Sequence, residues 1–162
     1  MRVLIAYRSR YGTTASCARA LASLLRSPSE IVDLGRTRAI DLQPFDVVVI
    51  GGSIYGGKIL PQVPAFCERN REALLDKRIG VFICCLYQGE HARMQLRAAF
   101  PGWVLERSFA HALAGGELVH SKLTLIDRLL VQRLPQGRRD ILRLNPEALQ
   151  ALADAVNALA AT

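Results

Sequence analysis

Short apolar runs alternate along the chain with stretches in which apolar residues recur at helical spacing. Four of the runs are nearly continuous, with few polar positions: Val3–Tyr7, Val47–Ile50, Ile79–Cys85 and Ser108–Ala114. Continuous runs of this length are typical of strands that are covered on both faces of a sheet. A weaker run, Glu30–Leu34, predicts a strand nearer the edge of the same sheet.

The segments between these runs predict helices. In Thr14–Arg26, for example, Cys17 and Leu21 fall on one helical face. The pattern predicts further helices over Pro61–Leu75, which begins with proline, over His91–Phe100, and over Pro146–Leu159 with Asn145 as its N-cap.

Regular alternation of strand and helix predicts an α/β fold with a parallel sheet and right-handed crossovers. Five strands favour a doubly wound sheet of order 2-1-3-4-5 with helices on both faces, and 162 residues fit one such domain, residues 1–162. In this architecture a ligand binds where the strand order reverses, beside strands 1 and 3. The loops after strands 1, 3 and 4 should therefore form the site: Arg8–Thr13, Gly51–Leu60 and Leu86–Glu90.

Composition narrows the possible chemistry. The four cysteines show no CxxC spacing and the three histidines are scattered, so the sequence predicts thiols that pack in the core and no metal site.

The N-terminus enters a strand directly, without the apolar stretch of a signal peptide, which favours the cytoplasm. The net charge of +7 comes without a recognisable nucleic-acid module, so we expect a solvated basic surface and no nucleic-acid partner.

The first loop has the composition of an anion site. Hydroxyls, a glycine and a helix N-terminus come together there, and these groups favour a single phosphate. It is neither a Walker loop nor GxGxxG, and the same residues also suit an ordinary turn in which Thr13 or Thr14 caps the helix. The candidate residues are Ser9, Arg10, Tyr11, Gly12, Thr13 and Thr14.

The second and third loops each combine an aromatic residue with glycine. A tyrosine flanked by glycines suits stacking on a planar ring, although Tyr55 could instead act only as a lid over the sheet end. Together with a phosphate site, these loops indicate a mononucleotide with a large planar head. The candidate residues are Ser53, Ile54, Tyr55, Gly56 and Gly57 in the second loop, and Leu86, Tyr87, Gln88 and Gly89 in the third.

These motifs resemble a known family. Ser9, Gly12 and Thr14 after the first strand resemble the phosphate loop of flavodoxins. The stretch Val47–Gly57 is similar to the second flavin loop of the subgroup that contains the menaquinone-dependent protoporphyrinogen oxidases. The strand Phe109–Gly116 and the residues from Ile126 to Leu129 resemble that subgroup too, so the likeness covers nearly the whole chain.

The resemblance implies FMN, with its phosphate at Ser9–Thr14 and its isoalloxazine between Tyr55 and Leu86–Gly89. It also implies that no protein residue is the catalytic nucleophile, because the flavin carries the redox chemistry and the protein tunes it. Backbone amides of Gly56, Gly57 and Gly89 are the candidates for that tuning.

The net charge of the chain helps to distinguish an electron carrier from an enzyme within this family. Flavodoxins that carry electrons are generally acidic, whereas this chain is basic. We therefore expect an FMN-dependent oxidoreductase that passes electrons between an organic substrate and a quinone, similar to protoporphyrinogen oxidase. The alternative is a flavodoxin-type carrier with a protein redox partner. The stretch after Arg133 and the third loop both depart from the oxidase sequence, which leaves protoporphyrinogen itself open as the substrate.

A segment at about residues 117–143 is placed like the insertion of long-chain flavodoxins. A helix over Lys122–Leu134 would have Leu123, Ile126, Leu130 and Leu134 on one side, with basic flanks at Lys122, Arg128, Arg133, Arg138, Arg139 and Arg143. Such a helix could rest on the inner face of an anionic membrane through residues 122–143, or cover a quinone-sized pocket. The alternative is that its apolar side packs on the domain and the arginines are only solvated. A homo-oligomer is compatible with the resemblance, but no stretch of the sequence locates an interface.

Overall fold

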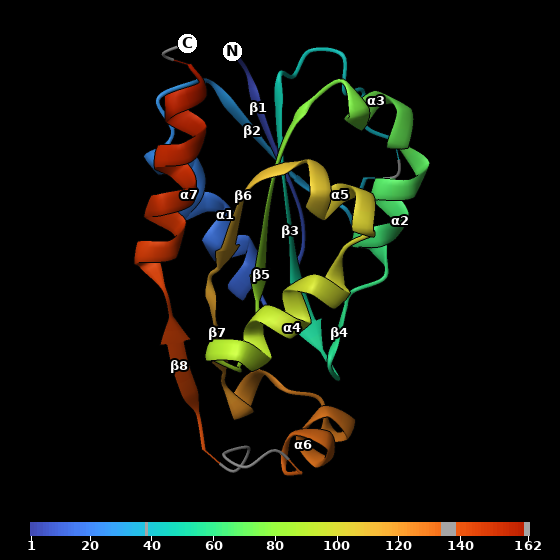
Figure 1. Cartoon of the computed structure of the whole chain (residues 1–162). Helices are drawn as coiled ribbons and strands as arrows, with labels where there is room; N and C mark the ends of the chain where they lie inside the picture. Colours follow the sequence, from blue (N-terminus) through green and yellow to red (C-terminus); the bar gives the residue numbers. More distant parts are fainter. Residues whose placement is uncertain (38, 134–138, 161–162) are drawn as a thin grey trace.

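A five-stranded parallel sheet forms the centre of the computed structural model, which describes residues 1–37, 39–133 and 139–160 (Figure 1). The strand order is β2-β1-β3-β5-β6, so the five predicted strands pair in the predicted order. A short strand, β4, pairs antiparallel with the end of β3. The bounds are β1 (Val3–Arg8), β2 (Ser29–Asp33), β3 (Val47–Tyr55), β4 (Lys58–Ile59), β5 (Arg78–Cys84) and β6 (Ser108–Leu113).

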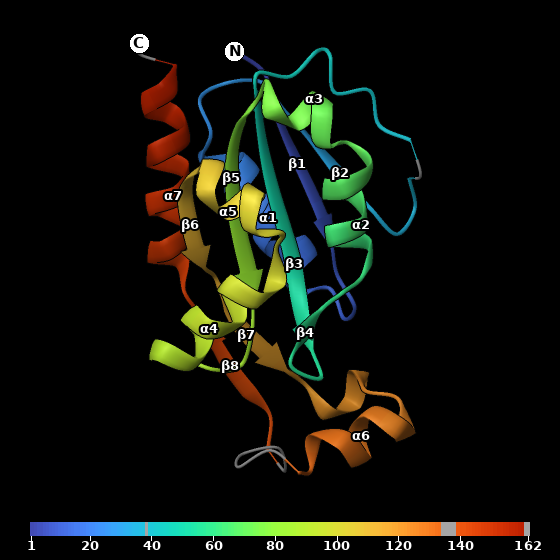
Figure 2. The same ribbon diagram turned by 45° about the vertical axis from the view of Figure 1, so that its right-hand side comes forward.

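Helices cover both faces of the sheet, as the two views in Figures 1 and 2 show. One face packs on α1 (Thr13–Leu24) and α7 (Pro146–Leu159). The other packs on α2 (Gln62–Arg69), α3 (Arg71–Leu75), α4 (Gly89–Ala99) and α5 (Gly102–Arg107). Successive strand residues point to opposite faces, so β1 contributes Val3 and Ile5 to the first core and Leu4 and Ala6 to the second. This two-sided burial explains the continuous apolar runs.

Two regions show how far the local sequence predicts where helices begin and end. Asn145 caps α7 as predicted, since its Oδ1 accepts from the Ala148 amide at 3.1 Å and Pro146 occupies the first turn. The single helix predicted over Pro61–Leu75 is wrong, because α2 and α3 are separate helices that meet at Asn70. The Asn70 side chain donates to the Phe66 carbonyl at 2.9 Å and so satisfies one of the last carbonyls of α2.

We call residues 115–144 the inserted segment. Its described residues, 115–133 and 139–144, lie beyond the carboxyl ends of the parallel strands and at the far end of the molecule from both termini (Figure 1). β7 (Gly115–Leu118) and β8 (Ile141–Leu144) pair antiparallel in a small sheet of their own. Between them are a 3-10 turn, η1 (His120–Lys122), and the helix α6 (Leu125–Val131). The insertion predicted at about residues 117–143 thus forms a separate substructure of the domain.

The predicted start of a helix at Lys122 is wrong. The helix begins after Thr124, whose hydroxyl accepts from the Asp127 amide at 3.2 Å, so Leu123 precedes α6 and does not share a helical face with Ile126. Asp127 and Val131, one turn apart, then face inward, whereas Ile126 is 71% exposed and Leu130 47%. Leu134 and Arg138, which belonged to the prediction, lie outside the described residues.

Candidate functional site

A cavity of about 620 Å³ opens at the carboxyl ends of β3 and β5, between the strand loops, α4 and the inserted segment. All three predicted loops contribute to its wall. The predicted site residues in the wall are Arg10, Tyr11, Thr13, Ser53, Ile54, Tyr55, Gly56, Gly57, Leu86 and Tyr87. Ser9, Gly12, Thr14, Gln88 and Gly89 lie in the first and third loops or in the first turns of α1 and α4 that follow them, and they are not part of the wall.

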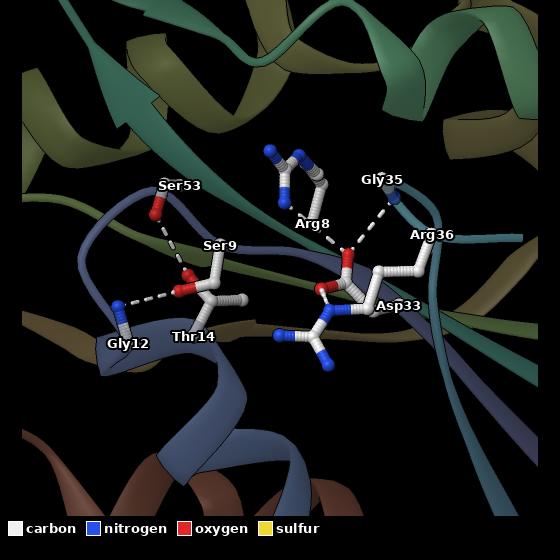
Figure 3. Close-up of polar contacts among 8 residues, drawn as sticks. All are labelled: Arg8, Ser9, Gly12, Thr14, Asp33, Gly35, Arg36 and Ser53. Atoms are coloured by element: carbon white, nitrogen blue, oxygen red, sulfur yellow. Dashed lines mark hydrogen bonds and ion pairs between the residues drawn. The ribbon is translucent and has the colours of Figure 1, made fainter.

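The β1–α1 loop has the geometry of an anion site. Gly12 is the N-cap of α1 with φ of +99°, a conformation that glycine adopts at little cost. Its amide donates to the Ser9 hydroxyl at 2.9 Å (Figure 3). No side chain caps α1, so the alternative in which Thr13 or Thr14 caps the helix is wrong. The amides of the first turn therefore remain available for an anion.

Thr14 joins the first loop to the second. Its side chain is fully buried, and its hydroxyl lies 2.9 Å from the Ser53 hydroxyl at the end of β3 (Figure 3). A second pair of polar side chains in Figure 3 links the ends of β1 and β2. The Arg8 guanidinium donates to the Asp33 carboxylate at 3.3 Å. Hydrogen bonds thus link the start of α1 to β3 and the end of β1 to β2.

The second loop is more regular than predicted. The prediction of a loop over Gly51–Leu60 is wrong, because β3 continues through Tyr55 and turns at Gly56 and Gly57 into β4. Gly51 stays in the strand because its missing side chain leaves room for the Phe82 ring, which a Cβ would overlap. The two turn glycines have φ of +57° and +77°, and a Cβ on either would meet open space. Tyr55 is therefore held at the end of a hairpin.

Tyr55 is held from two sides. The guanidinium of Arg10 lies 4.0 Å from the centre of its ring, and its hydroxyl donates to Asp127 of α6. Arg10 also pairs with the Asp127 carboxylate at 3.0 Å. The Nε of Arg10 lies 3.3 Å from the Tyr11 hydroxyl. This contact raises the pKa of Arg10 above its ordinary value, Asp127 acts in the same direction and partial burial opposes both.

Several residues of the wall were not predicted. From α4 come His91, Met94 and Gln95, and from the inserted segment Gly116, Glu117, Leu118 and Val131. Leu123 and Leu130 also line the wall, and the sequence had predicted them on a helix face that could cover such a pocket. Asp127, buried next to this wall, was also missed. Its sequence signal is Thr124 three residues before an acidic residue, a pattern that marks a helix start. That pattern locates the helix but not the partners of the carboxylate.

Apolar groups dominate the rest of the wall. Cys84 and Cys85 line it at the end of β5, and burial raises the pKa of the Cys85 thiol. Burial likewise raises the pKa of Cys67, which is not part of the cavity wall, to about 12. All four cysteines are buried and free, as expected of thiols that pack in the core.

These features fit a mononucleotide with a flat head. An uncapped helix N-terminus with neighbouring hydroxyls suits one phosphate, while Tyr55 and Tyr87 in the wall offer aromatic surfaces. The cavity volume lies within the range of small-molecule sites, about 300–1,000 Å³. None of the helices in the described ranges has the length and apolar character needed to span a bilayer.

Comparison with known proteins identifies the family and supports the fold. Residues 4–140 match a family described as flavodoxin domain. Among solved structures, rubredoxin oxygen:oxidoreductase from Desulfovibrio gigas superposes with a TM-score of 0.61 at 18% identity. That match covers 99% of this chain but only 36% of that protein. A WrbA-like flavodoxin protein from Agrobacterium tumefaciens gives a TM-score of 0.59 at 14% identity, covering 99% and 98% of the two chains. A flavodoxin from the domain Archaea gives 0.55 at 15% identity, covering 96% and 99%. At these identities the structural matches establish the fold alone.

Proposed function

The chain belongs to the flavodoxin domain family, and from that premise we propose that it is an FMN-dependent oxidoreductase that passes electrons between an organic substrate and a quinone. FMN is the cofactor that this membership implies, and it supplies the redox chemistry when bound. The observation that carries the choice of an enzyme is the apolar part of the cavity wall, formed by α4 and the inserted segment.

The three loops divide the binding of FMN between them. Amides of the first turn of α1, with the hydroxyls of Ser9, Thr13 and Thr14, would hold the phosphate, because N–H groups and the helix dipole favour an anion there. Tyr55 and Tyr87 would contact the flat ring system. Gly56 and Gly57, both with positive φ and open space around them, allow backbone amides to approach that ring closely. These roles are the ones that the sequence predicted.

The remaining wall suits a flat, mostly apolar substrate. Met94 on α4 is 58% exposed, and Leu130 on α6 lines the same cavity, so these side chains are accessible to a ligand. A quinone has this character, and so does protoporphyrinogen. A carrier that gives electrons to a protein partner does not need an apolar cavity wall beyond the residues that hold its cofactor.

Reoxidation kinetics test the proposal. Purified protein would be loaded with FMN, reduced anaerobically by light and EDTA, and mixed with menadione in a stopped-flow instrument. We expect fast reoxidation that slows at least tenfold in Met94→Glu and Leu130→Glu, because a charge in the apolar wall disfavours the quinone. The matched control is Leu75→Glu on α3, which lies outside the cavity wall. Wild-type reoxidation that is slow with menadione, and fast only with a protein acceptor such as cytochrome c, would instead identify a carrier.

The outer side of α6 supports a further part of the same proposal, contact with an anionic membrane surface. Leu125, Ile126 and Leu129 are exposed by 78%, 71% and 66%, and they lie on one side of the helix. Exposed arginines, among them Arg128 and Arg133, adjoin this apolar face, and the whole chain carries +7. An apolar face with basic edges is the composition of interfacial helices. A lipid-dissolved quinone would then enter the cavity from the surface on which α6 rests.

Vesicle co-sedimentation tests this contact. We expect binding to vesicles containing phosphatidylglycerol and little binding to phosphatidylcholine alone. The triple variant Leu125→Gln, Ile126→Gln, Leu129→Gln should lose most of the binding, whereas Leu75→Gln at the opposite end of the molecule should keep it. Equal sedimentation of the triple variant and the wild type would refute the membrane contact and leave the FMN site untouched.

A further inference from the structure

The inserted segment places one buried carboxylate, Asp127, against two of the predicted cofactor residues. We propose that Arg10, Asp127 and Tyr55 act as one positioning unit for the flat ring of the cofactor, and that Arg10 supports Tyr55 instead of binding the phosphate. The inference rests on the proposed FMN binding and assigns a residue of the inserted segment, Asp127, to the cofactor site.

The position of Arg10 in the first loop would suggest that it binds the phosphate. A cation beside an anion site would ordinarily be taken as a phosphate ligand. In this structure, however, its Nη2 lies 3.2 Å and 3.0 Å from the two Asp127 oxygens, and its Nε lies 3.3 Å from the Tyr11 hydroxyl. Its guanidinium carbon lies 4.0 Å from the centre of the Tyr55 ring, well within the range of a cation–π contact. The side chain is thus directed toward α6 and the β3–β4 hairpin.

Asp127 is a buried carboxylate, with a side chain that is 2% exposed. Among the described residues, the Arg10 guanidinium and the Tyr55 hydroxyl donate to it, and Arg10 balances its charge. A buried carboxylate that loses its partners is strongly destabilising, so the three groups stay together or rearrange together. This coupling predicts that removing any one member releases the other two.

Arg10 and Asp127 together orient the Tyr55 side chain. Its hydroxyl is fixed by Asp127 and one side of its ring is covered by Arg10. The residue lines the cavity, so the opposite ring face is the one left for stacking on a planar ligand. Because Asp127 lies on α6, the orientation of this ring depends on how the inserted segment is seated.

Comparison of FMN with riboflavin, which lacks the phosphate, separates the two roles of Arg10. Dissociation constants would be measured by quenching of flavin fluorescence for Arg10→Gln, Asp127→Asn and Tyr55→Phe. We expect each variant to weaken both ligands by the same factor, about 3- to 30-fold. The double variant Arg10→Gln, Asp127→Asn should be no weaker than the weaker of its two single variants, since the groups act as a unit. Ser9→Ala with Thr14→Ala is the contrasting variant, expected to weaken FMN alone.

Two outcomes would overturn the inference. One is an Arg10→Gln variant that weakens FMN and leaves riboflavin unchanged, which would make Arg10 a phosphate ligand. The other is additive effects of Arg10→Gln and Asp127→Asn, which would show independent roles.

Hydrogen exchange of the ligand-free protein tests the unit separately from cofactor binding. Asp127→Asn should speed exchange at least threefold in the amides of both α6 and the β3–β4 hairpin. The matched control is Asp140→Asn, which removes another carboxylate of the inserted segment that is exposed and bonded to His120. Unchanged exchange in Asp127→Asn would refute the unit. A wild-type protein that binds neither flavin would refute the proposed function, while this measurement would still decide on the unit.

Discussion

The main body of the domain and the inserted segment differ in how they treat apolar side chains. In the body, residues such as Leu4, Phe66 and Phe82 are completely buried between the sheet and its helices. In the inserted segment, Leu125 is 78% exposed and Leu142 72%, and the described core is a small cluster around Leu118, Leu123 and Val131. Packing therefore stabilises the body, while the inserted segment presents apolar surface to the solvent.

The contacts between the two regions also differ from those within the body. Polar groups of the segment reach the first loop through Asp127, which pairs with Arg10, and through Glu117, which accepts from the Thr13 hydroxyl at 3.5 Å. Both carboxylates contact residues of the predicted cofactor site. If FMN binds as proposed, the body would hold the phosphate, whereas the segment would orient the ring site and limit what can approach it.

We expect the largest effect, a loss of FMN affinity, at the β1–α1 loop, which we propose as the phosphate site. Replacing Ser9 and Thr14 by alanine removes two hydroxyls that would bond a charged group, each worth about 1.5–3 kcal/mol. FMN affinity should fall about 100-fold or more, as measured by fluorescence titration. Ser16→Ala with Ser23→Ala, which removes two exposed hydroxyls of α1 outside the cavity wall, is the control. FMN affinity unchanged in the Ser9 and Thr14 double variant would remove the phosphate assignment.

Core packing in the body gives the next largest effect. Phe66→Ala removes a fully buried ring between α2 and the sheet, and the cost is expected at about 3–5 kcal/mol in the free energy of unfolding. For a domain of this size that lowers the Tm by about 6–20 °C, which a thermal melt followed by circular dichroism measures. A change below about 1 kcal/mol would contradict the assigned core.

Tyr55 lies where the two regions meet. Tyr55→Ala should cost about 1–3 kcal/mol of affinity for FMN and for riboflavin alike, the usual worth of aromatic stacking on a planar ring. The measurement is the same fluorescence titration with both ligands. Full retention of both affinities would mean that Tyr55 only covers the sheet end.

Leu129→Ala is the counterpart of Phe66→Ala in the inserted segment. Because Leu129 is 66% exposed, its truncation should change the free energy of unfolding by no more than about 0.5 kcal/mol. A urea titration of both variants gives the comparison directly. A loss comparable to that of Phe66→Ala would show that the outer face of α6 is packed in solution, for example against a second copy of the chain.

The smallest effect concerns pH. The His120 backbone amide donates to Asp140 at 2.8 Å and lowers the pKa of that carboxyl, with the His120 ring adding to the effect. A lowered pKa gives stability that is present above the ordinary value of the carboxyl and is lost as the pH falls through the lowered one. Protection of the β7–β8 amides from hydrogen exchange should therefore decrease in acid, and Asp140→Asn should remove this decrease. An identical pH dependence in the variant would contradict the contact.

Local sequence was sufficient for the sheet and for the position of the cavity. Four continuous apolar runs and the weaker run Glu30–Leu34 identified the five parallel strands, and their alternation with helices predicted the order and the three loops at its reversal point. It failed at Gly51, where glycine suggests a loop but in the fold makes room for Phe82 within a strand. That reason depends on a neighbouring strand and is invisible in the local pattern.

The inserted segment was predicted less well for the same reason. A helical stripe through Leu123 and Ile126 assumed a helix that begins at Lys122, whereas the Thr124 cap starts it later and changes the inward face. The partners of Asp127 lie 117 and 72 positions away in the sequence, and spacing carries no signal at such separations. Short-range patterns predicted the elements, while the contacts between distant residues that complete the cavity required the structure.

Titration of the ligand-free protein with FMN, followed by flavin fluorescence and with riboflavin in parallel, is the decisive measurement for the proposed cofactor site. We expect one FMN per chain, quenched fluorescence, and riboflavin binding at the same site at least tenfold more weakly because the phosphate contact is missing. Fluorescence that stays unquenched with protein in large excess would contradict it, and so would equal affinity for the two flavins, which would leave the β1–α1 loop without a phosphate to hold.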